Sequence, residues 1–136
     1  MTAERERFLP PERTISGTLG IEILEWEDGR STGRIPVTER ILQPFGLVHG
    51  GAMLTLAETL ASHGTWVAVR DEGKLAMGQE INASLLRPIT SGHVNGAAVA
   101  RRRGRTAWVW DVEITDDDGR LCALVRATIA VRAPER

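Results

Sequence analysis

The stretch from His49 to Val69 has the clearest periodic pattern in the chain. Its apolar and small side chains recur at intervals of three and four residues, which predicts one face of a long α-helix. The residues on that face are Met53, Leu56, Ala57, Leu60, Ala61, Gly64, Val67 and Ala68. Glu58 is the only formal charge in the stretch, where average composition would supply about five. We therefore expect a helix covered on most sides, with Ala61 and Gly64 allowing a sheet to approach closely.

Alternating apolar segments before and after this helix predict strands. Two precede it, at 19–26 and 30–37, joined by a turn at Asp28-Gly29 and followed by a connecting loop. Four more follow it, with short turns that suit hairpins, at 75–86, 93–103, 106–115 and 121–132. No helices alternate with the later strands, which disfavours a doubly wound parallel sheet. The pattern predicts an α+β fold, one long central helix wrapped by a five- to six-stranded antiparallel sheet.

The length of 136 residues suits one domain. We place it at 15–133, after a charged, proline-containing N-terminal arm at 1–14. Cys122 is the only cysteine, so no internal disulfide is expected. The N-terminus lacks the apolar core of a signal peptide. The sequence also contains no run of eighteen apolar residues, which a membrane-spanning helix would need. A cytoplasmic protein is the expectation, with no membrane partner.

Composition also argues against two classes of ligand. The formal net charge is −1 and the chain has no tyrosine, whereas nucleic-acid binding needs a broad basic face with stacking aromatics. Trp108 and Trp110 lie two residues apart, hence on one face of a strand, and are expected in the core or at an interface. Three histidines and one cysteine show no metal-ligand spacing, so no metal is expected.

A line of polar residues on the predicted helix suggests chemistry. Thr55, Glu58, Ser62 and Thr65 follow one another at spacings of three, four and three residues, which forms one stripe opposite the apolar face. A solvated outer face would normally carry several Lys, Arg or Glu residues. A buried structural Glu58 paired with an arginine is the stronger alternative. We favour a working carboxylate.

The start of the helix, at Gly50-Gly51, offers backbone N–H groups and a positive dipole end. Such an end can polarise a carbonyl and stabilise an oxyanion. The alternative is a glycine-rich turn that merely enters a helix. Glu58 lies eight residues beyond Gly50, ~12 Å along the axis, whereas a catalytic group must lie ~3 Å from the atom that it serves. If both act on one carbonyl, they come from different copies of the chain. This geometry predicts a homodimer with interfacial sites, where Gln43 and His49 belong with Gly50.

The combination of Gln43, His49-Gly50-Gly51, Glu58 and Ser62 resembles the hotdog-fold acyl-CoA thioesterases of the PaaI-like superfamily. The greatest similarity is to the branch of the Arthrobacter-type 4-hydroxybenzoyl-CoA thioesterase and the bacterial thioesterases of enterobactin and menaquinone metabolism. It covers roughly residues 16–132.

The resemblance implies a role for each of these residues. Glu58 would be the nucleophile or the general base, and the Gly50 amide would polarise the thioester carbonyl with Gln43 as a further donor. His49 would orient the thiolate or the acyl carbonyl. Ser62 would position water or Glu58. A dimer of dimers is implied by the resemblance alone.

The arginines at 101, 102, 103 and 105 lie close to a predicted hairpin turn at Gly104. Guanidinium groups bind phosphate bidentately, although a hairpin kept soluble by charge is the alternative. The resemblance implies that this turn and the strand end near 84–88 line the CoA channel. The residues expected to contact CoA are Ser84, Leu85, Arg87, Arg103, Gly104 and Arg105. CoA would arrive as part of the substrate, and no separate cofactor is expected.

These observations predict a thioesterase that hydrolyses an aromatic or medium-chain acyl-CoA to the free acid and CoA. Met53, Thr55, Thr59, Trp66 and the loop near Phe45 are candidates to shape the acyl pocket. A hotdog hydratase is the first alternative, but no second His–acid pair is evident. A non-catalytic acyl-CoA-binding protein is the second, and it would have little need for Glu58.

Overall fold

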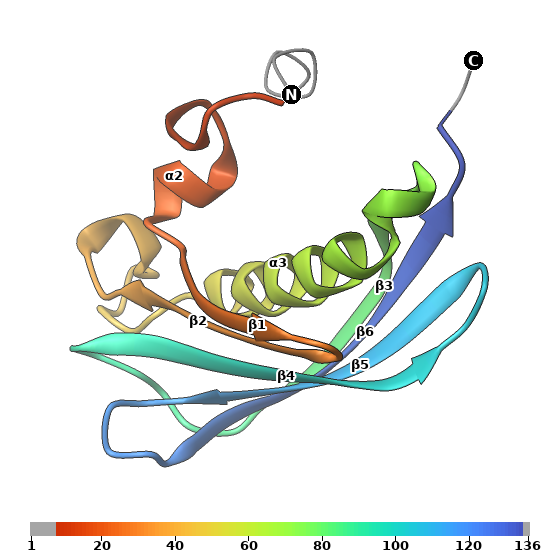
Figure 1. The fold of residues 1–136 in the computed structure, drawn as a ribbon. Helices are drawn as coiled ribbons and strands as arrows, with labels where there is room; N and C mark the ends of the chain where they lie inside the picture. The colour runs from red at the N-terminus through yellow and green to blue at the C-terminus, as the bar shows by residue number, and fades with distance from the viewer. Residues whose placement is uncertain (1–7, 135–136) are drawn as a thin grey trace.

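The computed structural model describes residues 8–134. Figure 1 shows the helix α3 (Gly50–Val69) lying along the concave face of a curved sheet. Within the described residues the sheet has six antiparallel strands in the order β1-β2-β4-β5-β6-β3. Their bounds are β1 Glu22–Glu27, β2 Arg30–Pro36, β3 Leu75–Leu85, β4 His93–Arg103, β5 Ala107–Thr115 and β6 Leu121–Arg132. The predicted α+β architecture is confirmed.

The main difference from the sequence prediction lies before β1. Residues 19–21, expected to start a strand, instead belong to the end of the short helix α2 (Ile15–Leu19) and its exit turn. Gly20 ends this helix in the left-handed conformation, with φ of 78°, which glycine adopts without steric cost. Leu19 and Ile21 pack against the core, so their apolar character reflects burial at a turn. Short 3-10 turns also form at η1 Pro11–Arg13, η2 Glu39–Ile41 and η3 Arg70–Glu72.

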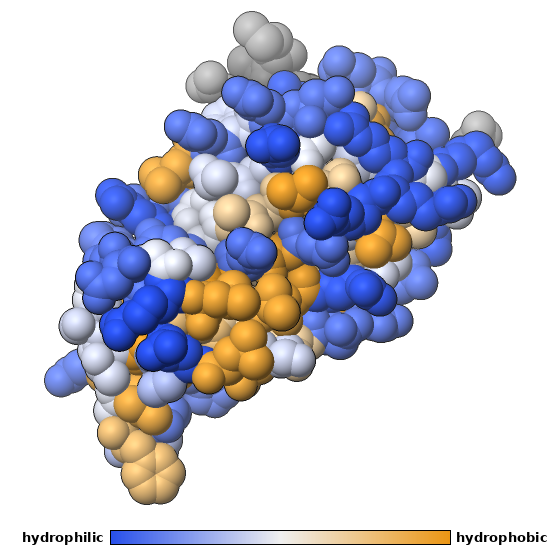
Figure 2. Space-filling view, turned by 90° about the horizontal axis from the view of Figure 1, so that it is seen from below, coloured by the Kyte–Doolittle hydropathy of each residue, from blue (hydrophilic) through white to orange (hydrophobic). Residues whose placement is uncertain are grey.

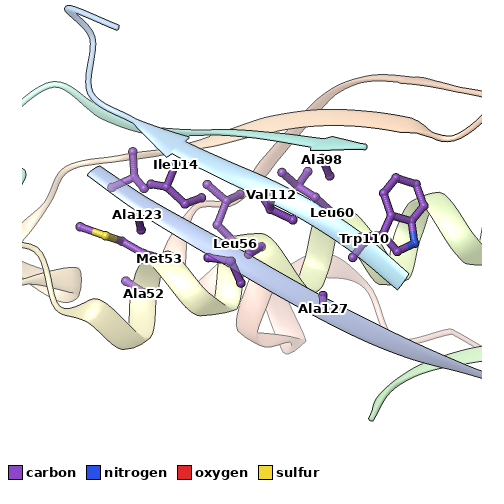
Figure 3. Close-up of a cluster of buried hydrophobic side chains, with 14 of the residues drawn as sticks. Ala52, Met53, Leu56, Leu60, Ala98, Trp110, Val112, Ile114, Ala123 and Ala127 are labelled. Carbon is purple, nitrogen blue, oxygen red and sulfur yellow. The ribbon is translucent and has the colours of Figure 1, made fainter. Parts of the chain in front are cut away.

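Two glycines bring the sheet close to the helix. Gly33 in β2 and Gly96 in β4 are directly paired, and both face Leu60 of α3. A Cβ on either would lie 2.8 Å from a Leu60 methyl group, closer than carbon atoms approach. The pair therefore forms a hollow that Leu60 fills. Figure 3 shows Leu60 in the buried cluster between α3 and the strands.

Trp110 of β5 provides the second close contact with α3. Its ring lies where a side chain at Gly64 would project, and its indole N–H donates to the Thr65 hydroxyl at 2.8 Å. Thr65 is fully buried, so the predicted polar stripe is wrong at this position. The ring of Trp108, also buried, stacks with that of Trp110 at 6.0 Å between centroids. Both indoles thus belong to the core, one of the two placements predicted.

The strand β3 is an exposed edge of the sheet. Among residues 8–134 it is bonded only to β6, and most of its eleven residues are exposed. Figure 2 shows apolar side chains gathered on the face seen from below. Large exposed apolar residues on or beside β3 include Met77, Leu85 and Leu86. Among the described residues, no helix is long and apolar enough to cross a membrane.

Candidate active site

The first half of the predicted site lies at the N-terminus of α3. A cleft of about 300 Å³ opens there. It is lined by Gln43, Leu47, Val48, Gly50, Met53, Leu85, Leu86, Arg87 and Pro88. Gly50 packs so closely on Leu85 that a Cβ would lie 2.5 Å from a methyl carbon. A side chain at residue 50 would therefore have to displace Leu85.

His49 caps the helix. Its Nδ1 accepts a hydrogen bond from the Gly51 N–H at 2.8 Å, which satisfies one of the free donors of the first turn. When the ring is neutral its proton is then on Nε2, which leaves that atom as a donor. The Gly50 N–H has no hydrogen-bond partner within residues 8–134, so it remains available at the positive end of α3.

Gln43 is held by the loop that leads into the helix. Its backbone N–H donates to the Leu47 carbonyl at 2.8 Å and its carbonyl accepts from Gly46 at 2.9 Å. Its side-chain oxygen accepts from the Phe45 N–H. The side-chain NH₂ group therefore remains available as a hydrogen-bond donor. An oxyanion requires donors of this kind.

The second half of the site lies on α3 beside the edge strand β3. Glu58 and Ser62 line a cleft of about 740 Å³. Glu58 is exposed, and its carboxylate lies against the backbone of Gly78 in β3. It forms no salt bridge with any described residue. The alternative of a buried structural glutamate paired with an arginine is therefore wrong. Gly78 was not identified from the sequence, where a glycine within a strand only suggests a bulge or a close approach.

Aromatic side chains form the wall beside Glu58. The His63 ring lies edge-on to Trp26, 5.2 Å between centroids, and 6.5 Å from Trp66. Burial, and to a smaller extent the nearby Arg70 charge, lower the pKa of His63 below 6.5. Its Nδ1 is buried without a hydrogen-bond partner among the described residues. His63, to which the sequence analysis gave no role in the site, thus lines the same cleft as Glu58.

The predicted CoA-binding residues fall into separate regions of one chain. Leu85 and Arg87 border the Gly50 cleft, whereas Ser84 lines a different cleft, of about 460 Å³, with Arg101 and Asp111. At the β4–β5 turn, Arg103 is paired with Asp28 and stacks on Trp108.

Arg105 borders a further cleft with Lys74, and Gly104 packs its Cα against the Ala107 carbonyl. Lys74 and Leu85 mark opposite ends of β3, roughly 35 Å apart at about 3.3 Å per residue. A single chain therefore does not bring all six predicted residues together. Within residues 8–134, no group of three His, Cys, Asp or Glu side chains could hold a metal ion.

The predicted catalytic residues are likewise divided. Gln43 and Gly50 line one cleft and Glu58 and Ser62 line another, on the same helix. A free amide at a helix N-terminus and an unpaired carboxylate are the two components that acyl transfer requires, a polariser and a nucleophile or base. This arrangement suits the class of acyl-transfer enzymes.

Comparison with known proteins agrees with this class. The model of the thioesterase superfamily matches residues 45–123. The proofreading thioesterase EntH of Klebsiella pneumoniae is 40% identical over 120 residues, 88% of this chain and 87% of that protein. The 1,4-dihydroxy-2-naphthoyl-CoA hydrolase of Listeria monocytogenes is 39% identical over 115 residues, 85% of this chain and 93% of that protein.

The thioesterase PA1618 of Pseudomonas aeruginosa is 40% identical over 120 residues, 88% of this chain and 83% of that protein. The crystal structure of a mutant of it matches with a TM-score of 0.85 at 39% identity, covering 89% of this chain and 87% of that chain. The chain belongs to the thioesterase superfamily. Its fold is the predicted hotdog fold, and its relatives indicate a thioester hydrolase.

Proposed function

We propose that the protein hydrolyses acyl-CoA thioesters in sites shared between two copies of the chain. Glu58 and Ser62 of one subunit act with Gln43, His49 and Gly50 of the other. The observation that carries the proposal is the free Gly50 N–H and the unpaired Glu58 in separate clefts of one helix. Since ~12 Å of helix separates the two residues, neither can complete the site within its own chain.

The residues suit the chemistry of thioester hydrolysis. The Glu58 carboxylate attacks the carbonyl carbon, or removes a proton from a water that attacks it. The Gly50 N–H and the Gln43 amide donate to the developing oxyanion. The carbon–sulfur bond then breaks and CoA leaves as the thiolate, which the His49 Nε2–H would stabilise as a donor. If Glu58 is the nucleophile, water then hydrolyses the mixed anhydride that it has formed with the acyl group, which releases the free acid and restores the carboxylate. Ser62, one turn from Glu58, positions the water or the carboxylate. CoA arrives with the substrate, and no separate cofactor takes part.

The exposed strand β3 supports a dimer. A long edge strand with free backbone groups is a template for pairing with another chain. Within one chain Gly78 lies beside Glu58 and Leu85 beside Gly50. Antiparallel pairing of two β3 strands centred near Asn82 would set Gly78 opposite the partner subunit's Leu85, allowing for the bulge between Gly78 and Glu80. Each Glu58 would then lie near the other subunit's Gly50. A further pairing of dimers remains an expectation from the family.

Several observations support the choice of substrate. The cleft beside Glu58 has mainly apolar walls that include Trp66 and Thr59, two of the predicted pocket residues, and suits an aromatic or medium-chain acyl group. The Listeria relative is named for a naphthoyl-CoA substrate. Leu85 and Arg87 border the Gly50 cleft, which suits entry of the CoA arm there. We also propose that CoA contacts the other predicted residues, Ser84, Arg103, Gly104 and Arg105. The chain would belong to the 4-hydroxybenzoyl-CoA thioesterase branch.

Release of free thiol from a panel of aroyl-CoA and fatty acyl-CoA thioesters tests the activity. Glu58→Gln preserves the shape of the side chain and removes its charge, so it should reduce kcat by on the order of 10²-fold or more with an unchanged melting temperature. Equal rates in the variant and the wild type would remove Glu58 from the mechanism. Binding of acyl-CoA without hydrolysis by the wild type would favour a non-catalytic acyl-CoA-binding protein.

Subunit complementation tests the shared site. Chains carrying Glu58→Ala and chains carrying Gln43→Ala are each expected to be inactive. Mixed dimers should regain activity, because one of their two sites contains both native residues. Asn82→Cys tests the pairing, since two such residues near the dimer axis should form an intersubunit disulfide on oxidation. Arg126→Cys, one strand further in, is the matched control. Mixed dimers that form but remain inactive would contradict the arrangement.

A further inference from the structure

We propose that the N-terminal segment 8–16 forms the outer wall of the acyl pocket and that Phe8 and Leu9 set the length of acyl group that the enzyme accepts. This inference rests on the proposed function, because it assigns the cleft beside Glu58 to the acyl group. It adds a specificity element that lies outside the central helix and the strands. It also gives a function to residues at the boundary of the predicted arm and the domain.

The cleft is built from three parts of the chain that are distant in sequence. One side is the open face of α3 and another is contributed by β1 and the start of β3. The remaining side is the N-terminal segment, which Figure 1 shows on the side of α3 away from the sheet. The lining residues from that segment are Phe8, Leu9, Pro11 and Ser16. Without them, the helix face beside Glu58 would be open in this direction.

Contact with the helix is made through aromatic rings. The Phe8 ring packs edge-on against Trp66, with centroids 5.6 Å apart and planes at 73°. Arg70 lies over the same Trp66 ring at 5.2 Å. The indole thus contacts both Arg70 and Phe8. Phe8 and Leu9 remain 51% and 57% exposed, which leaves apolar surface for an acyl group to cover.

The segment is anchored at its C-terminal side. The Thr14 hydroxyl donates to the Pro11 carbonyl at 2.8 Å, and the Ile21 N–H donates to the Ser16 carbonyl at 2.8 Å. Gly17 packs directly on the Pro11 carbonyl, where a Cβ would collide. Since Leu19 and Ile21 pack against the hydrophobic core, the wall is connected to the core through α2. It is a built part of the cleft.

Position along the helix predicts a dependence on acyl length. Trp66, which Phe8 contacts, lies eight residues beyond Glu58, or ~12 Å along the axis. An acyl group whose carbonyl is held at Glu58 must extend along the helix to reach Phe8. Acetyl and butyryl groups are too short to do so, whereas a decanoyl chain approaches this length and an octanoyl chain covers most of it.

Steady-state kinetics of Phe8→Ala and Leu9→Ala on acetyl-, butyryl-, octanoyl- and decanoyl-CoA test this. We expect kcat/KM for the two long substrates to fall about three- to tenfold per variant, the loss of one apolar contact. The change should lie mainly in KM, and the values for the short substrates should stay within about twofold. Glu12→Ala is the matched control, since Glu12 is exposed in the same segment and does not line the cleft.

The outcomes separate this inference from the proposed function. If the wild type hydrolyses none of the thioesters, the proposed function fails. If it hydrolyses them and the variants change all four substrates equally, or none of them, the segment does not select length. Loss of the fold would reduce all four rates together and would be visible in the melting temperature. In that case Phe8→Leu, which keeps part of the apolar contact, should still lower kcat/KM for the two long substrates, by less than is expected of Phe8→Ala, and should leave the short substrates unchanged.

Discussion

The Glu58 carboxylate lies directly against the backbone of Gly78, so that β3 contributes a surface without a side chain to the site. A methyl group at residue 78 would collide with the carboxylate oxygen. Because the colliding atom is the end of a flexible, exposed side chain, the collision can be relieved by moving the carboxylate. Chemistry is more sensitive to this movement than folding is.

Gly78→Ala should therefore lower activity much more than stability. Displacement of a catalytic group by about 1 Å can reduce the rate on the order of 10²-fold, whereas the melting temperature should change little. Thioester hydrolysis and thermal unfolding of the same preparation measure the two effects. A variant that loses stability but retains full kcat would show that the contact has only a structural role.

His49→Asn should separate helix capping from catalysis. Asparagine is among the best N-cap residues, so it can replace the acceptor that His49 Nδ1 offers to the Gly51 N–H. It lacks the donor at the position of Nε2. We expect the free energy of unfolding to be retained and kcat to fall. His49→Ala, which also loses the cap, should cost about 1 kcal/mol of stability in addition. Unchanged kcat in His49→Asn would limit the residue to capping.

Thr65→Val should destabilise the fold through Trp110. The substitution keeps the shape of the side chain but leaves the buried indole N–H without its acceptor, at a cost of about 1–3 kcal/mol. Urea denaturation provides the measurement. Thr59→Val is the control, because in the described part of the chain the Thr59 hydroxyl donates to a carbonyl of its own helix and accepts from no indole. If both variants lost the same free energy of unfolding, the indole hydrogen bond would make no net contribution to stability.

Gly96→Ala should overfill the hollow occupied by Leu60. Overpacking of this kind costs about 1–3 kcal/mol. Leu60→Val removes volume from the same place, so the double variant should lose less stability than the sum of the two single variants. A double-mutant cycle by urea denaturation measures this coupling, and simple additivity would contradict the close contact.

His63 should make the fold less stable in mild acid. Burial and Arg70 lower its pKa in the folded protein, whereas in the unfolded chain it titrates near 6.5. As the pH falls below that value the unfolded chain binds the proton first, and stability decreases until the folded pKa is reached. His63→Leu should reduce the drop in melting temperature between about pH 7.5 and about pH 5.5. The same drop in both proteins would show that other groups account for it.

The periodicity of residues 49–69 was sufficient to predict α3, because a helix against a sheet requires apolar residues at intervals of three and four. The alternation of apolar and polar residues was likewise sufficient to predict five of the six described strands. It failed at residues 19–21, where Leu19 and Ile21 are buried by a helix end and a turn. A short apolar run cannot distinguish these cases. Likewise, Thr65 was assigned to a polar stripe because helix spacing alone does not reveal the indole beside it.

For the site, the sequence by itself determined the separation of Glu58 from Gly50, since the rise per residue of a helix depends on nothing else in the fold. It also provided the candidate residues. Only the tertiary structure decided what surrounds them. Gly78 and Phe8 become neighbours of the site, and Trp26 becomes a neighbour of His63, through contacts between segments far apart in the chain. No local pattern encodes such contacts. The curvature of the sheet and the path of the N-terminal segment bring these residues to one face of α3.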